Sequence, residues 1–450
     1  MKDKHDHAAA FVFSARASCP RPLSTSVQNA SVTGMWAEFL QVLHRTGRIL
    51  RFLGRCPTAA EPCVGLGGLR AWAEASGVPY KAHECYDLEL QDFYGSLQAR
   101  GARGLEKVHT GPEEGDVQRL HFSKLMDCEI LLSGPPCQPF CKGGARKGSS
   151  DCRSDVLESV VSMVMELAWR GSLVAFVIEN SSALPSHEYF KELLRRLECT
   201  VPFFRMEVVR RNLKDLVPHQ RERAWLRGLR TDCLDDVTVP GLPPAASAME
   251  MGTDKLTLES YLEEGAPPAD PATLTTIMQA NLSLYKDLCA KAHKASPHVR
   301  VFAVELDRNP LKNYGGCVSE DCIPPLRTGG PKVFLLSAAD IGKCWKQMKY
   351  HRFLLVSERF ALQGHSPESA QDFRGKSAAV KAAGNAFNVL AMASMLTPLL
   401  ESAARNGVLQ RGGIVKRTTA ELLQLDNSFQ PQQSQQDQER VCAGKRKRAG

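Results

Sequence analysis

A cysteine on a proline-rich loop is the side chain in this sequence best placed to act as a nucleophile. The loop, residues 133–140, reads Ser-Gly-Pro-Pro-Cys-Gln-Pro-Phe and places Cys137 soon after an apolar run at residues 128–132. Proline restricts the backbone, so the three prolines stiffen the loop, and a rigid loop suits a nucleophile that must be aimed. The alternative is an unreactive cysteine in a turn.

A carboxylate follows the next apolar run. Glu179-Asn180 comes directly after residues 173–178. Catalytic groups of open parallel sheets collect at the carboxyl ends of the strands, so we expect Cys137 and Glu179 at one edge. An acid beside a thiol suits attack on a heteroaromatic ring, because protonation of a ring nitrogen lets the adjacent carbon accept the nucleophile. The alternative role for this pair is a helix N-cap.

Two arginines have the spacing to hold an oxygen of such a substrate. Arg221 and Arg223 are two residues apart, and on a strand this spacing points both side chains to one face. Guanidinium groups bind phosphate or carbonyl oxygens through paired N–H donors. The alternative is a solvated run of charges.

Residues nearer the N-terminus indicate a nucleoside-containing cofactor. Gly65 and Gly67 follow a first predicted strand, and Glu84 is expected to end the second, where an acid holds ribose hydroxyls. Asp116 is expected to accept a hydrogen bond from an adenine amino group. No Walker-type lysine accompanies these residues, which argues against a nucleoside triphosphate site.

The elements that must position these side chains alternate between strand and helix. Between the apolar runs at residues 128–132 and 173–178, Val156, Val160, Val164 and Leu167 have helical spacing. Apolar strands joined by helices predict an α/β fold with a doubly wound parallel sheet.

The predicted organisation has five parts. An N-terminal extension at residues 1–57 contains an amphipathic helix at residues 35–53, expected to pack on the domain, and is followed by a core at residues 58–230. A second, smaller and irregular domain at residues 231–350 is rich in Pro and Gly turns. Helical patterning returns at residues 351–408, and a Gln-rich basic tail, expected to be disordered, occupies residues 409–450.

Composition limits the remaining classes. The chain has 450 residues and a net charge of +8, which permits polyanion binding without requiring it. Its 15 cysteines include no Cys-x-x-Cys pair, so we expect no metal site and a reducing compartment. We expect no membrane span and a monomer. A Lys-Arg-Lys-Arg run at residues 445–448 points to the nucleus, although such runs are also common in solvated tails.

Taken together, these motifs resemble those of the C5-cytosine DNA methyltransferases, over residues 61–400. The residues that carry the resemblance are residues 134–140, Glu179-Asn180, Arg221, Arg223, Gly65, Gly67, Gly115-Asp116, residues 358–364 and residues 384–387. The sequence departs from the family pattern at five positions. Cys63 replaces a phenylalanine, Val156 a leucine, Ser181 a valine, His219 a glutamine and Ala361 an arginine.

The resemblance implies an S-adenosyl-L-methionine (AdoMet) dependent enzyme with a Rossmann-like domain, in which residues 231–350 form a target-recognition domain. Cytosine is flipped out of duplex DNA, Cys137 attacks C6, Glu179 assists at N3, and Arg221 and Arg223 hold the ring oxygen. The residues expected to contact AdoMet are Gly65, Gly67, Glu84, Asp116, Pro136 and Asn385.

Two rival readings stay open. One is a tRNA methyltransferase of the same fold, whose branch carries a Cys-Phe-Thr tripeptide that this sequence lacks. The other is a catalytically weak relative that acts as a binding protein. For a DNA substrate, phosphates are expected to meet basic residues of the second domain, namely Lys312, Arg327, Lys332, Lys346 and Lys349.

Overall fold

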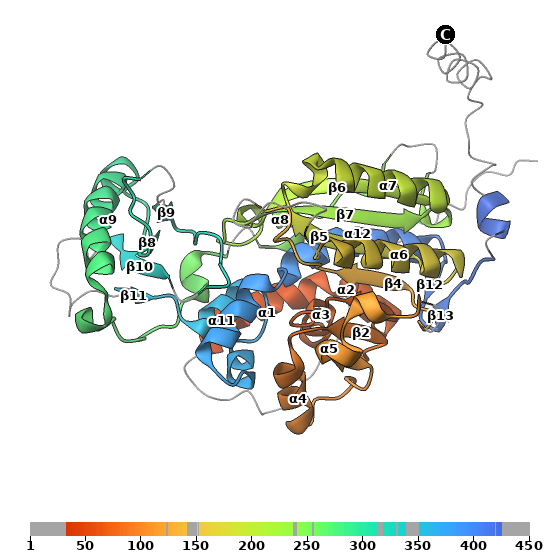
Figure 1. Ribbon diagram of the computed structural model, residues 1–450, viewed down its shortest axis with the longest axis horizontal. Coiled ribbons are helices and arrows are strands. Elements are labelled where there is room, and N and C mark those ends of the chain that lie inside the picture. The colour runs from red at the N-terminus through yellow and green to blue at the C-terminus, as the bar shows by residue number, and fades with distance from the viewer. Residues whose placement is uncertain are drawn as a thin grey trace, which may run out of the picture.

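The computed structural model describes residues 33–122, 125–141, 151, 153–236, 241–253, 256–312, 318–329, 332–338, 351–418 and 420–424. A large body carries a seven-stranded sheet, and a smaller lobe projects from one end of it (Figure 1). Lys346, Lys349 and the run at residues 445–448 lie outside the described residues.

The seven-stranded sheet has the order β3-β2-β1-β4-β5-β7-β6. Its strands are β1 (Ala59–Pro62), β2 (Glu84–Asp87), β3 (Val108–Thr110), β4 (Ile130–Ser133), β5 (Ala175–Ser181), β6 (Phe204–Asn212) and β7 (Glu222–Arg230). The first five are parallel, as predicted, whereas β7 runs antiparallel to β5 and to β6. The chain builds outward from β1 on one side and from β4 on the other, so the sheet has its topological switch point between these two strands.

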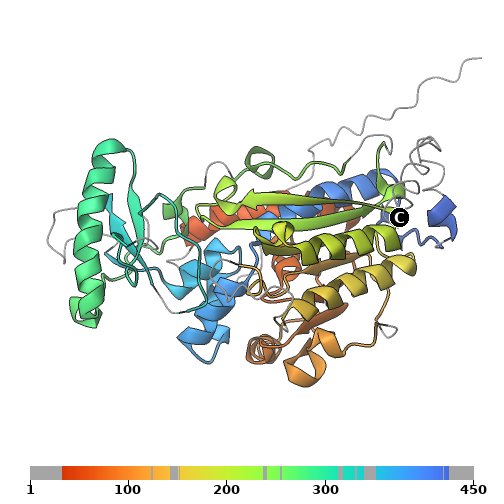
Figure 2. The ribbon, with the colours of Figure 1, turned by 45° about the horizontal axis from the view of Figure 1, so that its top comes forward.

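Helices cover both faces of this sheet. They are α1 (Thr33–Thr46), α2 (Arg48–Leu53), α3 (Gly68–Ala75), α4 (Gln91–Ala99), α5 (Gly111–Glu114), α6 (Ser154–Trp169), α7 (Glu188–Thr200), α8 (Ala248–Met251), α10 (Val356–Leu362), α11 (Lys376–Asn385) and α12 (Val389–Arg405). Side chains alternate across β4, so Ile130 and Leu132 pack with α1, α2, α3 and α12, while Leu131 packs with α6 and α7. Figure 2 shows α6 and α7 lying along their face of the sheet. The doubly wound α/β prediction is therefore confirmed.

The lobe is more regular than the sequence indicated. Its four-stranded sheet has the order β11-β10-β8-β9, formed by β8 (Val301–Glu305), β9 (Ser319–Glu320), β10 (Val333–Ser337) and β11 (Arg352–Phe353). The 20-residue helix α9 (Thr276–Ala295) packs on it through Tyr285 and Cys289. The Tyr261 ring packs edge-on against Phe39 of α1, and the Ala246 N–H donates to the Ser394 carbonyl of α12 at 2.9 Å. The first part of residues 231–350 therefore packs on the body, so the predicted start of this domain at residue 231 is too early.

Both predicted ends of the body also need correction. Phe39 and Leu50, on α1 and α2, are buried in the main core, so the amphipathic helix packs on the domain as expected and is part of it. A hairpin of β12 (Leu409–Gln410) and β13 (Gly413–Ile414) follows α12, and Leu422 is fully buried against the α6 face. The folded body therefore extends beyond residue 408, where the disordered tail was predicted to begin.

The stretch Lys376–Arg405, which contains α11 and α12, is long enough to span a membrane, and its most apolar 18-residue window has a mean hydropathy of 1.3. However, 83% of its most apolar window is buried within the fold. This burial is typical of a core helix.

Candidate active site

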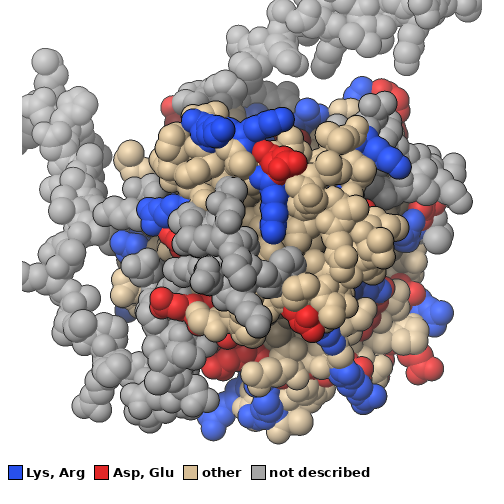
Figure 3. All heavy atoms as spheres, turned by 90° about the vertical axis from the view of Figure 1, so that its left-hand side faces the viewer, with Lys and Arg blue, Asp and Glu red and all other residues tan. Residues whose placement is uncertain are grey.

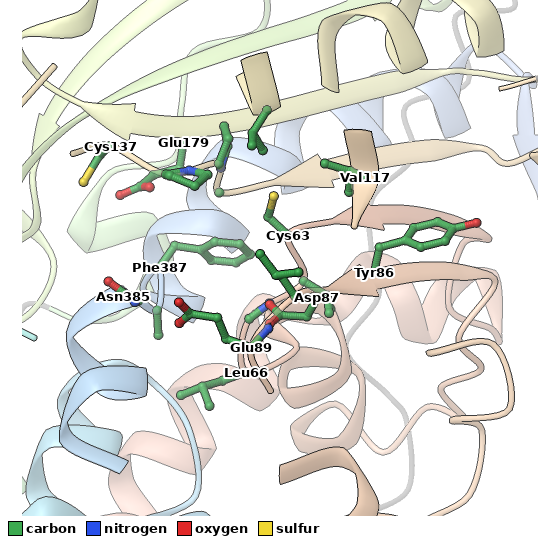
Figure 4. A pocket seen from close by; sticks show the side chains of 18 of the residues that line it. Cys63, Leu66, Tyr86, Asp87, Glu89, Val117, Cys137, Glu179, Asn385 and Phe387 are labelled. Carbon is green, nitrogen blue, oxygen red and sulfur yellow. The ribbon is translucent and has the colours of Figure 1, made fainter. Parts of the chain in front are cut away.

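A cavity of about 510 Å³ opens at the carboxyl ends of the central strands. Its walls come from the segments after β1, β2, β3 and β4, from Glu179 near the end of β5, and from the C-terminal end of α11 with the turn that follows it. In Figure 4, Cys137 and Glu179 lie at one end, Tyr86 and Val117 at the other, and Cys63 and Phe387 between them. The cavity therefore sits at the switch point of the sheet, where ligands of doubly wound folds bind.

Cys137 is held in a tight turn directly after β4. The backbone N–H groups of Phe140 and Cys141 both donate to the Cys137 carbonyl, at 3.1 and 2.9 Å. The loop is tied to the next strand because the Asn180 side chain donates to the Pro135 carbonyl at 3.2 Å. Pro136 also lines the cavity. The loop that carries Cys137 is thus held by hydrogen bonds within its own turn and by a hydrogen bond from β5.

The surroundings of Cys137 favour its neutral thiol. The neighbouring Cys141 side chain, burial and the Glu179 carboxylate all raise the pKa of Cys137, while Arg223 opposes them. Because the thiolate is the reactive form of cysteine, the site needs a further positive charge or a bound substrate to favour ionisation.

Glu179 and the two arginines meet across the pair β5 and β7. Glu179 Oε1 lies 2.7 Å from Arg223 Nε and 3.9 Å from an Arg221 terminal nitrogen. The closer pair is not aligned as a hydrogen bond, so both atoms lack a hydrogen-bond partner among the described residues. Buried polar atoms normally have a hydrogen-bond partner. Because these two atoms have none among the described residues, they can make hydrogen bonds to a bound polar ring.

Arg221 is further inside than Arg223. It is almost fully buried directly before β7 and donates to the Gly384 carbonyl at 2.8 Å, which links the start of β7 to α11. Burial and the neighbouring Arg223 lower the pKa of Arg221 to about 9. Arg221 lines the cavity. Arg223 is not a lining residue, but it forms an ion pair with Glu179, which is one.

The glycine loop after β1 forms the other arm of the cavity. Gly65 and Gly67 have positive φ angles of 55° and 74°, which glycine adopts without a Cβ clash. Gly65 lines the cavity, while Gly67 caps α3 and is not among the lining residues. The Tyr94 hydroxyl donates to the Gly65 carbonyl at 2.7 Å, which fixes the loop.

The structure corrects the position of Glu84. β2 begins at Glu84 rather than ending there, so this carboxylate lies at the far end of the strand and accepts from Tyr86 Oη. Asp87 ends the strand instead, and its carboxylate accepts from the Gly65, Glu89 and Leu90 backbone N–H groups at 2.9–3.0 Å. Asp87 and Glu89 line the cavity and Glu84 does not.

The remaining predicted cofactor residues do reach the cavity. Asp116 caps the short helix that follows it by accepting from the Gln118 N–H, and it lines the cavity together with Asn385. An elongated cavity with glycines at one side, carboxylates at Asp87, Glu89 and Asp116, and a catalytic end at Cys137 fits a nucleoside-bearing methyl donor such as AdoMet. Phe387, in the motif at residues 384–387 that carries the family resemblance, also lines the cavity. Sequence reasoning missed Asp87, Glu89 and Thr328; an acid at the last position of β2 was the available signal for Asp87.

His219, which departs from the family pattern, joins the lobe to the body. Its Nε2 accepts from the Leu326 N–H at 3.3 Å, and its neighbour Gln220 donates to the Ile323 carbonyl at 2.8 Å. Burial and the nearby Arg221 hold the pKa of His219 well below its usual value, so the ring is neutral and able to accept. Thr328 from this lobe segment lines the cavity.

The basic residues of the lobe are partly neutralised. Arg327 pairs with Glu305 and Asp307, and Lys332 pairs with Asp307. Viewed from the lobe end, Lys and Arg side chains lie among Asp and Glu and near the margins of the described surface (Figure 3). In the part of the chain that the structure describes, no group of three or more His, Cys, Asp or Glu side chains is placed to hold a metal ion.

Comparison with known proteins gives the family. The model of the C-5 cytosine-specific DNA methylase family matches residues 60–400. The orphan methyltransferase M.Rho11sI of Bacillus phage rho11s is 28% identical over 177 residues, which cover 38% of this chain and 33% of the relative. The type II methyltransferase M.HhaI of Haemophilus parahaemolyticus is 27% identical over 177 residues, covering 38% and 48%.

The matched segment therefore spans about a third to a half of these curated relatives. Among solved structures, the S. pombe Dnmt2 methyltransferase is 13% identical, covering 77% of this chain and 99% of that chain, with a TM-score of 0.49. Family membership rests on the sequence match across residues 60–400 and not on this superposition. The chain belongs to the C-5 cytosine-specific DNA methylase family.

Proposed function

We propose that this protein transfers a methyl group from AdoMet to C5 of cytosine in duplex DNA, through a transient bond between Cys137 Sγ and C6. One observation carries the proposal. Cys137, Glu179 and Arg221 line the same cavity as the glycine loop and the carboxylates suited to a nucleoside, so a nucleophile and a donor site face one space.

The residues divide the chemistry between them. The Cys137 thiolate adds to C6, and the electron pair of the C5–C6 double bond becomes available at C5. Glu179 in its protonated form donates its proton to N3 and accepts a hydrogen bond from the exocyclic amino group, which neutralises the negative charge that builds on the ring, and N3 returns the proton when Cys137 leaves. Arg223 holds Glu179 in place, and Arg221 is aimed at the ring oxygen.

AdoMet supplies an electrophilic methyl group when it is bound. After transfer to C5, loss of the C5 proton to water re-forms the double bond and expels Cys137 as the thiolate, which regenerates the enzyme. The cytosine must leave the base stack to reach the cavity, because C6 is otherwise covered by neighbouring bases.

Covalent trapping tests the proposal directly. A duplex carrying 5-fluorocytosine cannot lose a proton from C5, so we expect an adduct with Cys137 that survives denaturing electrophoresis and requires AdoMet. The Cys137→Ser variant is the control, and it should form no adduct while still binding AdoMet. An AdoMet-dependent adduct in that variant would contradict the assignment of the nucleophile.

A parallel assay with tritiated AdoMet identifies the nucleic acid. We expect label in duplex DNA, and less of it as salt rises, because phosphate contacts release counterions. Label in total tRNA alone would replace DNA with the tRNA alternative and leave the Cys137 chemistry in place. Absence of label and of AdoMet binding would instead support the binding-protein alternative.

A further inference from the structure

Phe387 forms part of the wall of the cavity, although it comes from a segment far along the chain, and most of its ring is buried in the main core. It lies in the turn between α11 and α12, and its ring is seen between Glu179 and Cys63 in Figure 4. The turn is rigid because the Gln363 side chain donates to the Ala386 carbonyl at 3.2 Å and Asn388 caps α12. The ring position is therefore fixed by the backbone on both sides.

Two glycines make room for this ring. A Cβ atom on Gly68 would lie 2.4 Å from Phe387 Cε2, and one on Gly134 would lie 3.0 Å from Phe387 Cδ1. Gly68 begins α3 on the cofactor side, whereas Gly134 begins the Cys137 loop. The Trp225 ring packs edge-on at 6.4 Å between centroids. The ring therefore bridges the glycine loop and the nucleophile loop; a side chain at Gly68 would clash with it, and one at Gly134 would contact it tightly.

Cys63 explains why an aromatic ring is needed there. It follows β1, lines the same cavity and stands where the family pattern has a phenylalanine. Its side chain is far smaller than an aromatic ring, and burial raises the pKa of its thiol, so it presents only a small neutral surface. Aromatic rings supply large, rigid apolar walls for ligand pockets. An aromatic wall of the cavity would therefore have to come from an element other than the loop that carries residue 63.

We propose that Phe387 is a cofactor-contacting residue that supplies the aromatic wall of the AdoMet site in place of position 63. The proposal rests on the proposed function, since it names AdoMet as the ligand. The aromatic ring is then carried by the turn between α11 and α12, whereas the family pattern carries it on the loop after β1. Phe387 and Cys63 are thus a matched pair, and the pocket needs one aromatic side chain from the two positions.

Binding of AdoMet to the full chain without DNA tests this pairing by isothermal titration. Phe387→Ala should weaken AdoMet binding about tenfold, because a rigid apolar wall is lost. The double variant Cys63→Phe with Phe387→Ala should recover most of that loss. Phe203→Ala, which removes a fully buried ring from the α6 and α7 face, is the matched control and should leave the affinity unchanged.

The outcomes separate the inference from the function beneath it. Unchanged affinity in Phe387→Ala, or a double variant that binds no more tightly than Phe387→Ala, would overturn the pairing. If Phe387→Ala does not fold, Phe387→Leu keeps apolar bulk without the aromatic face, and it should bind AdoMet more weakly than wild type; equal binding overturns the proposal. A wild-type chain that does not bind AdoMet at all would remove the proposed function itself.

Discussion

Glu179 is the residue whose carboxyl group the proposed chemistry uses most directly, as the acid that acts on the ring nitrogen. Its Oε1 lies 2.7 Å from Arg223 Nε, and the carboxylate is nearly buried, so its charge acts at short range in a poorly solvated space. Interactions that strengthen only as charge develops raise kcat rather than substrate affinity. Glu179 is therefore expected to act in the chemical step and not in docking.

The variant Glu179→Gln tests this assignment at the residue scale. The amide keeps the shape of the side chain but loses the charge and the acidic proton. We expect kcat to fall by about two to four orders of magnitude, with little change in the DNA dissociation constant measured by fluorescence anisotropy. A fall in affinity as large as the fall in rate would make Glu179 a recognition residue.

The ionisation of Cys137 gives a second prediction at the residue scale. A thiol is ionised above its pKa, and the raised pKa of Cys137 moves the reactive thiolate to more alkaline pH. Alkylation by iodoacetamide, followed by mass spectrometry from about pH 7 to about pH 10, should still be rising for Cys137 at the alkaline end. The exposed Cys199 is the internal comparison. Faster alkylation of Cys137 than of Cys199 at neutral pH would contradict the expected environment.

At the scale of the elements, Asp87 at the end of β2 holds the glycine loop through a hydrogen bond from the Gly65 N–H. The Asp87 carboxylate accepts three backbone N–H groups, two from its own loop and one from Gly65, so it joins two cavity walls. Burial nevertheless raises the pKa of Asp87, which means that these hydrogen bonds only partly offset the loss of solvation. A change at Asp87 should therefore alter the shape of the cofactor arm.

Asp87→Ala and Glu84→Ala form a matched pair of variants on one strand. The first removes the hydrogen bonds to the loops and should weaken AdoMet binding by about 1–3 kcal/mol. The second removes a carboxylate outside the cavity and should leave binding unchanged. Titration calorimetry of both variants checks the correction, and a loss confined to Glu84→Ala would restore the assignment made from the sequence.

At the scale of the whole molecule, the lobe is joined to the body by a shared hydrophobic cluster, which includes Val301 and Leu335 of the lobe, and by specific polar contacts. One is the His219 junction, and another is the buried ion pair of Arg352 with Glu358 at 2.6 Å, which lies between β11 and α10. The lobe segment fixed by His219 carries Thr328 into the cavity wall. The position of the lobe and the shape of the catalytic cavity are therefore linked.

His219→Leu should disturb this link. It removes the acceptor of the Leu326 N–H and leaves that group unpaired, whereas His219→Gln retains an acceptor oxygen. We expect a raised KM for DNA in the leucine variant with a smaller change in kcat, and partial rescue in the glutamine variant. Steady-state kinetics on a short duplex measure both quantities. Equal behaviour of the two variants would show that the hydrogen bond does not position the lobe.

The nature of the central elements was determined by the sequence itself. Continuous apolar runs are typical of strands covered on both faces, and side chains directly after such strands meet at one edge. That reasoning was sufficient to place Cys137 and Glu179 together, because each depends only on local sequence and on a general rule of parallel sheets. It failed at β2, where a short strand of mixed polarity left its end ambiguous and Glu84 was chosen instead of Asp87.

Only the tertiary structure decided the contacts between distant segments. Phe387 packs between Gly68 and Gly134, and His219 accepts from Leu326, across separations of more than a hundred residues. No periodicity links such pairs, because they meet only after the sheet and its helices have closed around the core. The sequence predicted a second domain but not the sheet and helix inside it, since its strands are short and its helix α9 buries few side chains. Local patterns specify elements, and packing specifies which of them share a wall of the active site.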